Sequence, residues 1–169
     1  MVSIVDEGFD CALRAGPLAD SSLVARKLGE GTQRVIASPE YLKTHEEPET
    51  PDALARHDAI VFTGRKQATR WPFIVEGKKT LVTVAAKYKA NSMLLVRELA
   101  KSGLGVAMLP TFLTAEPVRR GELRELLAGF PAPRGAAFVV YPSERHLAPR
   151  TRAFVDLLVA HFEQRGIEG

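Results

Sequence analysis

Short apolar segments alternate with helical segments along almost the whole chain, and this alternation limits the folds that it can adopt. Such a pattern is typical of α/β domains, in which helices cover the faces of a sheet, and it predicts mainly parallel strand pairing. About eight segments are strand-like, namely 9–14, 21–29, 34–39, 59–62, two within 70–88 that are joined by a turn at 76–78, 105–110 and 136–142. The expected helices are 39–45, 51–58, 91–103, 111–123, broken near Pro117, and 149–165.

Residues 91–110 form the clearest unit, a capped helix that leads directly into a buried strand. Asn91 or Ser92 is expected to cap the helix, and Gly103 suits the left-handed position after its end. The free N–H groups at the helix start favour a carboxylate or another anion, and Gly105 permits a close approach of other groups. A helix–strand packing unit without a ligand explains the same residues.

The strand near the start of the chain and the last helix each show an apolar pattern that predicts which side chains lie on one face. The strand 9–14 ends in Arg14, directly before a turn that contains Gly16 and Pro17. Its alternation places Phe9, Cys11 and Leu13 on one face. The last helix is expected to bury a stripe formed by Phe154, Val155, Leu158 and Phe162.

The composition indicates an ordinary globular chain that acts in a reducing compartment. Hydrophobic residues make up 46% and charged residues 25% of the 169 residues, enough to build a core. Cys11 is the single cysteine, so no internal disulfide can form, and we interpret it as a small buried hydrophobic residue. The first residues lack the basic and apolar regions of a secretory signal, and no apolar run is long enough for a membrane helix. We therefore expect a cytoplasmic protein.

The sequence offers no catalytic constellation. It contains neither the G-x-S-x-G elbow nor H-E-x-x-H, cysteine pairs for zinc or a glycine-rich phosphate loop. The four histidines are scattered, and the carboxylates show no paired arrangement. We expect no enzymatic activity, no metal and no cofactor.

Positive charge is concentrated in residues 64–89, which contain seven basic residues and one acidic residue. Trp71, Phe73 and Tyr88 lie among them, so the segment resembles a phosphate-binding surface. Its alternation also fits a β-ribbon with a solvated lysine face. Attraction for an anionic small molecule or an acidic partner remains open.

Five stretches of the sequence together resemble the effector-binding domain of LysR-type transcriptional regulators. They are VDEGFDCALRAGPLADSSLVARKL, RVIASPEYLKTH, PDALARHD, GLGVAMLP and VVYPSERHLAPRTRAFVDLL, and they follow the family's order over residues 4–163. The block at 141–158 is the most specific of them.

The resemblance implies a fold like that of type 2 periplasmic binding proteins, with two α/β lobes joined by two crossover strands. The crossovers are expected near 35–39 and 105–110, lobe I in residues 1–34 and 111–169, and lobe II in 39–105. The family's winged helix-turn-helix and the first strand–helix–strand of lobe I have no counterpart here, so we expect a domain that lacks this part. Its loss would expose sheet edges and apolar surface near Phe9, Cys11 and Leu13.

The resemblance also implies a ligand between the lobes. On one wall Arg14, with Gly16 and Pro17 after it, would pair with a carboxylate effector, unless it forms a salt bridge with Asp10 or Asp20 instead. The opposite wall is expected to hold Asn91, Ser92 and Met93, with Gly105 and Met108 beside them, and Ser38 near a crossover. The pocket would lack the loop after the family's first strand.

We therefore expect a regulatory module that binds a small anionic organic effector and forms a dimer or higher oligomer. Contact with DNA would require the absent N-terminal domain. Two alternatives stay open: an interaction protein that pairs with full-length regulators, and a solute-binding protein of the same fold.

Overall fold

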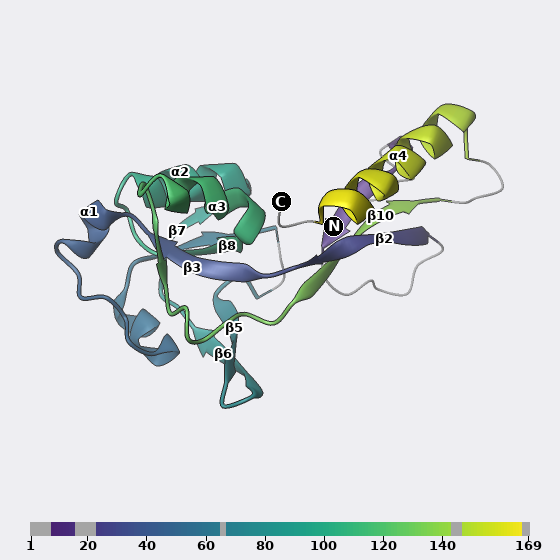
Figure 1. Ribbon diagram of the computed structural model, residues 1–169. Helices are drawn as coiled ribbons and strands as arrows, with labels where there is room; N and C mark the ends of the chain where they lie inside the picture. Colours follow the sequence, from purple (N-terminus) through teal and green to yellow (C-terminus); the bar gives the residue numbers. More distant parts are fainter. Residues whose placement is uncertain (1–7, 16–22, 65–66, 143–146, 167–169) are drawn as a thin grey trace. The chain divides into compact units, whose positions relative to one another are not determined.

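The computed structural model describes residues 8–15, 23–64, 67–142 and 147–166, and the chain divides into two compact units (Figure 1). Unit 1 consists of residues 1–31 and 134–169, and unit 2 of residues 32–133. Within the described residues, no helix is long and apolar enough to cross a membrane.

Unit 2 is built around a mixed sheet. Strand β3 (Gln33–Ala37) pairs antiparallel with β8 (Ala107–Pro110) and with β9 (Arg124–Leu126). Strand β4 (Ala59–Phe62) pairs parallel with β7 (Ala86–Ala90), and a parallel bridge between Ala59 and Val106 joins β4 to the start of β8. The result is a sheet whose strands β4, β7 and β8 all end at the same edge.

Alternate residues of these strands enter two different cores. Ile36, Ile60 and Leu109 pack beneath the helices α2 (Met93–Lys101) and α3 (Thr111–Arg119), which lie side by side in Figure 1. Val35, Val61 and Met108 belong to the other core, which holds the inner face of the hairpin formed by β5 (Arg70–Val75) and β6 (Lys78–Thr83). The period-2 alternation of the strands thus produces a three-layer unit.

Two short helical segments complete unit 2. Helix α1 (Pro39–Leu42) begins after the cap Ser38, and the 3-10 helix η1 (Pro51–Arg56) follows an acidic loop. Both begin with proline, which suits the first helical position because its missing N–H has no partner there.

Unit 1 is a three-stranded antiparallel sheet packed against one helix. Strand β10 (Gly135–Tyr141) lies between β1 (Ala12–Ala15) and β2 (Val24–Gly31), and α4 (Pro149–Arg165) packs against the sheet. Val155 and Val159 are buried in this core, whereas Phe154, which we expected in the buried stripe, is 50% exposed. The stripe is rotated toward Thr151 and Val159, because only the side of α4 that faces the sheet meets apolar partners.

The α/β class is confirmed, but the prediction of mainly parallel pairing is wrong. Of the named strand pairs among the described residues, only β4 and β7 run parallel. Strands such as β10 and β2 are far apart in the sequence, so the alternation of elements did not determine their direction.

The expected lobe boundaries differ from the two units. Both segments that we expected as crossovers contain buried strands of unit 2, because Val35 and Ile36 of β3 pair with Met108 and Ala107 of β8. Residues 111–133 also belong to unit 2, since β9 pairs with β3. The chain instead passes between the units at residues 31–32 and 133–134.

Candidate functional site

The carboxyl ends of the parallel strands in unit 2 bring polar groups together, as expected for a binding edge in an α/β sheet. At this edge Phe62 of β4 lies opposite Ala90 of β7. Thr63 follows β4, and both its backbone N–H and its hydroxyl donate to the Ala90 carbonyl, at 2.8 and 3.2 Å. Asn91 and Ser92 follow Ala90 and are exposed. Thr63 thus joins the predicted residues at this edge, and no sequence motif marked it.

Ser92 is the residue that caps helix α2. Its hydroxyl accepts from the Leu95 N–H at 3.4 Å, and its backbone is extended, so the helix starts at Met93. The N–H groups of a helix's first turn have no carbonyl partner within the helix, and they carry the positive end of its dipole. The expected helix start is confirmed, with Ser92 rather than Asn91 as the cap.

Gly105 and Ser38 lie at the opposite edge of the sheet from Asn91. Helix α2 starts at the carboxyl edge and runs back over nine residues, about 14 Å, before the chain reaches Gly105 ahead of β8. A Cβ on Gly103, at the far end of α2, would lie 3.7 Å from the Ser38 hydroxyl oxygen. The expectation that Gly105 lies beside Asn91 and Met93 is therefore wrong, because the helix between them separates the two ends.

At that edge, Gly105 allows two chain segments to approach closely and Ser38 caps a helix. A Cβ on Gly105 would lie 2.0 Å from the Asp58 carbonyl oxygen, where the chain before β8 crosses the start of β4. The Val106 N–H donates to that same oxygen at 2.9 Å. Ser38 is 2% exposed and accepts from the Tyr41 N–H at 3.2 Å as the cap of α1. Their predicted role as ligand contacts stays a prediction.

Met108 lies in the core below the sheet and lines a cavity of about 120 Å³. Thr32 and Thr111 line the same cavity, and both the N–H and the hydroxyl of Thr111 donate to the Thr32 carbonyl, at 3.1 and 3.3 Å. Arg34 also lines it and forms an ion pair with Glu125 at 2.7 Å. Met108 is buried and packs in this core, and its predicted role as a ligand contact stays a prediction.

Arg14 belongs to unit 1, where it lies on β1 opposite Phe138 of β10. The remaining described site residues belong to unit 2, so the predicted pairing of Arg14 with the same ligand stays a prediction. Gly16 and Pro17 lie outside the described residues.

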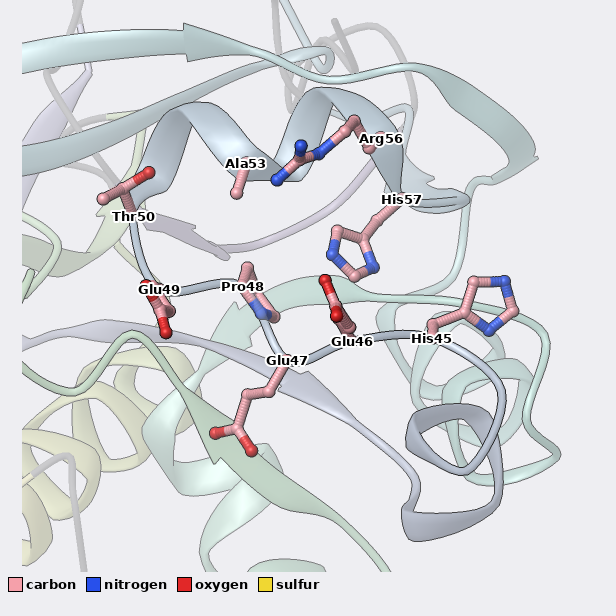
Figure 2. Close-up of a pocket in the computed structure, with 9 residues that line it drawn as sticks. All are labelled: His45, Glu46, Glu47, Pro48, Glu49, Thr50, Ala53, Arg56 and His57. Atoms are coloured by element: carbon pink, nitrogen blue, oxygen red, sulfur yellow. The ribbon is translucent and has the colours of Figure 1, made fainter.

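A second hollow in unit 2 is formed almost entirely by one loop and the helix after it (Figure 2). His45 and His57 lie at one end of it, and Glu49 and Thr50 at the other. His57 is 7% exposed and contacts the Tyr41 hydroxyl at 3.2 Å, and burial lowers the pKa of His57 below its ordinary value. Tyr41 in turn stacks on His45, with ring centroids 4.0 Å apart. These contacts hold the loop against α1.

No set of three or more histidine, cysteine or acidic side chains among the described residues is arranged to hold a metal ion. The acidic loop supplies three carboxylates to the lining of the hollow, Glu46, Glu47 and Glu49. One of its carboxylates, Glu47, pairs with Arg124 at 2.8 Å.

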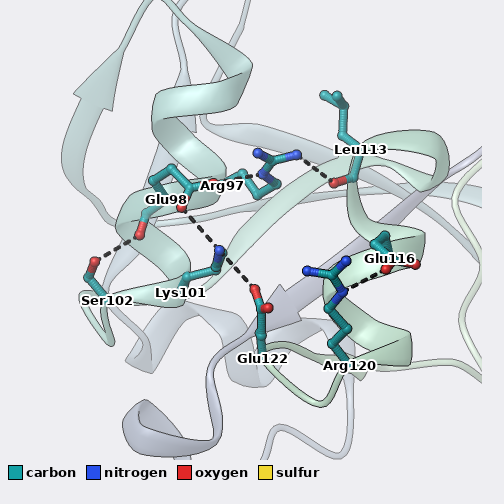
Figure 3. Close-up of polar contacts among 8 residues, drawn as sticks. All are labelled: Arg97, Glu98, Lys101, Ser102, Leu113, Glu116, Arg120 and Glu122. Atoms are coloured by element: carbon teal, nitrogen blue, oxygen red, sulfur yellow. Dashed lines mark hydrogen bonds and ion pairs between the residues drawn. The ribbon is translucent and has the colours of Figure 1, made fainter.

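Polar contacts connect helix α2 with helix α3 and with the residues that follow α3 (Figure 3). Lys101 of α2 bridges Glu98 at 3.2 Å and Glu122 at 2.8 Å, and the hydrogen bond to Glu122 raises the pKa of Lys101. Arg97 donates to the Leu113 carbonyl of α3 at 3.4 Å. That carbonyl lies four residues before Pro117, which has no N–H to donate. Arg97 thus supplies the hydrogen bond that proline removes, and α3 continues through the expected break.

We expect Arg97→Met to lower the free energy of unfolding by about 1 kcal/mol, because it leaves the Leu113 carbonyl without its donor. In a Pro117→Ala background the helix regains its own N–H donor, so the same substitution should cost less than half as much. Urea unfolding of the four variants measures this coupling. An equal cost of Arg97→Met in both backgrounds would show that Arg97 acts through another contact, such as its ion pair with Glu98.

Comparison with known proteins gives one consistent match. The family model described as the LysR substrate binding domain matches residues 1–163. A transcriptional regulator from Haemophilus influenzae is 36% identical over 146 residues, which are 86% of this chain and 51% of that protein. The regulator CrgA from Neisseria meningitidis is 35% identical over 159 residues, which are 94% of this chain and 53% of CrgA. The chain spans about half the length of the curated relatives that it matches.

The solved structures agree with the sequence matches. The regulatory domain of CrgA, a LysR-type regulator from Neisseria meningitidis, superimposes with a TM-score of 0.83 at 34% identity. The match covers 93% of this chain and 77% of that domain. Full-length AphB, a virulence activator from Vibrio cholerae, gives a TM-score of 0.77 at 25% identity over 92% of this chain and 52% of AphB.

Proposed function

Because this chain belongs to the LysR substrate-binding domain family, we propose that it senses a small organic anion as the effector-binding region of a LysR-type transcriptional regulator. The relatives that match it are transcriptional regulators. The proposed role is therefore binding and signalling rather than catalysis.

One observation supports the site more than any other. The capped start of α2 and the carboxyl ends of β4 and β7 meet at one edge of unit 2, where Thr63, Asn91 and Ser92 lie next to one another in the fold. Hydroxyl and amide side chains beside a helix N-terminus suit the recognition of a carboxylate. We propose that Met93 closes the apolar side of the site, because its side chain packs against the core below α2.

Arg14 is proposed as the cationic contact contributed by unit 1. An arginine can hold a carboxylate through two parallel hydrogen bonds, which gives orientation as well as affinity. The ligand would then engage both units at once. If the ligand makes more favourable contacts in one arrangement of the two units than in the other, its binding would shift the equilibrium between an open and a closed form. Contacts between copies would pass that shift to the DNA-binding part of the regulator.

Met93→Pro tests the helix N-terminus as the anion contact. Proline is well tolerated at the first helical position, and the extended backbone of Ser92 suits a following proline. The substitution removes one N–H donor, so a carboxylate bound there should lose about tenfold in affinity. Calorimetric titration with a panel of small carboxylates, including succinate, pyruvate and benzoate, measures the dissociation constants.

Met93→Ala is the matched control, since it removes the same side chain and keeps the N–H. Equal affinities of the two variants would place the anion elsewhere. The absence of saturable binding of any carboxylate to the unchanged chain would contradict the proposed ligand class.

A further inference from the structure

We propose that a small cavity in unit 2 binds a neutral, mostly apolar molecule whose carbonyl oxygen accepts a hydrogen bond from Nε of Arg34. The cavity measures about 120 Å³, and its lining residues all belong to unit 2. Phe73 and Met108 line it, so it lies on the side of the sheet that the β5–β6 hairpin covers. The groups at the carboxyl edge that we propose for effector binding are not part of this lining, so the two proposals are independent.

A buried donor at this cavity has no acceptor. Arg34 lines the cavity, and its Nη1 donates to Glu125 Oε2 at 2.7 Å. Among the described residues, Nε of Arg34 is the one buried side-chain nitrogen or oxygen that makes no hydrogen bond. A buried N–H group without an acceptor is destabilising, and a ligand that supplies the acceptor recovers this loss. The proposed bond requires the guanidinium to turn Nε toward the ligand while it keeps its contact with Glu125.

The rest of the lining favours an apolar ligand. The threonines there already donate to carbonyl groups, since the Thr32 hydroxyl contacts the Ala132 oxygen at 3.2 Å and the Thr111 hydroxyl contacts the Thr32 oxygen at 3.3 Å. Buried apolar residues form further parts of the wall, namely Val35, Phe73, Met108 and Leu126. A ligand with one acceptor and an apolar body therefore matches the groups that surround it.

The charge at this cavity favours a neutral ligand over an anion. Glu125 also lines the cavity, and its carboxylate already pairs with Arg34. A second carboxylate would lose its hydration and lie close to the charge of Glu125, whereas a carbonyl oxygen accepts the same hydrogen bond without a net charge. An apolar cavity of about 150 Å³ can bind benzene, so a ring of five or six carbon atoms is the appropriate size.

Backbone hydrogen bonds hold the wall of the cavity in place. The Ile74 N–H of the hairpin donates to the Pro131 carbonyl at 2.8 Å, which ties the loop after β9 to β5. Within that loop, the Phe130 N–H donates to the Leu127 carbonyl, also at 2.8 Å. Both Phe130 and Pro131 line the cavity. The site is therefore formed before a ligand binds, as is usual for small-molecule sites.

Amide NMR titration with cyclopentanone and methylenecyclopentane tests the hydrogen bond, because these two probes have nearly the same shape and only the first carries an acceptor. Both should give saturable shifts at Phe73, Leu126 and Phe130. Arg34→Lys places a methylene group where arginine has Nε and keeps a positive charge for Glu125. It should weaken the binding of cyclopentanone about tenfold and change that of methylenecyclopentane by less than about twofold.

Two further variants control for the charge change and for the location of the site. Arg120→Lys is the matched control, since Arg120 pairs with Glu116 at 2.6 Å and does not line the cavity. It should leave the affinities of both probes unchanged. Ala132→Val adds two carbon atoms to a buried residue of the lining, so it should weaken both probes to a similar extent.

The absence of saturable binding of either probe would overturn the proposal, and so would an equal loss of both probes in Arg34→Lys. Unchanged affinities in an Ala132→Val variant that circular dichroism shows to be folded would also overturn it, because the probes would then bind elsewhere. None of these results bears on effector binding, which is measured with carboxylates at Thr63 and Asn91.

Discussion

Gly105→Ala is expected to lower the free energy of unfolding of unit 2 by about 4 kcal/mol, among the largest effects of any single substitution in this chain. An added Cβ would lie 2.0 Å from the Asp58 carbonyl oxygen and 3.0 Å from its carbonyl carbon. Relief of this clash requires the chain before β8 to move away from β4. That movement would stretch two hydrogen bonds, Val106 N–H to Asp58 and Ile60 N–H to Val106, both 2.9 Å long. The backbone at Gly105 also has a φ of +155°, which other residues rarely adopt.

Urea unfolding followed by tryptophan fluorescence measures this effect, because Trp71 is the single tryptophan of the chain and is 3% exposed in unit 2. Gly129→Ala is the matched control, since no atom lies within 4 Å of its added Cβ. The control should unfold like the unchanged chain. A Gly105→Ala variant of nearly normal stability but weakened effector binding would instead assign Gly105 to the ligand site.

Phe73→Ala should cost a similar amount, about 4 kcal/mol, because it removes a large side chain from a packed core. Phe73 is 1% exposed and belongs to the core that also holds Trp71, Val35 and Met108. Its side chain packs the β5–β6 hairpin against the sheet. The substitution would therefore leave a cavity between the hairpin and the sheet. The same fluorescence measurement applies, since Trp71 lies on the same strand.

Leu81→Ala is the control on the opposite face of the same hairpin. Leu81 lies opposite Pro72 and is 42% exposed, so its truncation should cost less than about 1 kcal/mol. Similar costs for the two substitutions would mean that the hairpin does not bury its Phe73 face as the structure shows.

Features determined by neighbouring residues could be predicted from the sequence. The turn at Glu76 and Gly77 takes positive φ angles at both residues, as a tight hairpin requires, and the strands on either side form where expected. Helix α2 begins after a polar cap and ends before Gly103, whose φ is +79°. The family and the α/β class are confirmed by the domain match and by the related structures.

Features determined by distant residues could not be predicted in the same way. Strands β3 and β8 are apolar because they lie in the sheet of unit 2. Buried crossover strands between two lobes would have the same apolar sequence, so the sequence did not distinguish the two positions. Phe154 looked like a core residue on its helix, but its exposure depends on which strands lie beneath α4. Thr63 joins the candidate site through a hydrogen bond to Ala90, 27 residues away, which no local pattern indicates.

The most direct test of effector binding at the carboxyl edge of unit 2 is an amide NMR titration of the chain with the carboxylate panel. Binding at the proposed site predicts saturable shifts at Thr63 and Asn91–Met93, with the side-chain signals of Arg14 responding at the same ligand concentrations. Saturable shifts confined to the loop at 45–57, or no saturable shift at all, would contradict it.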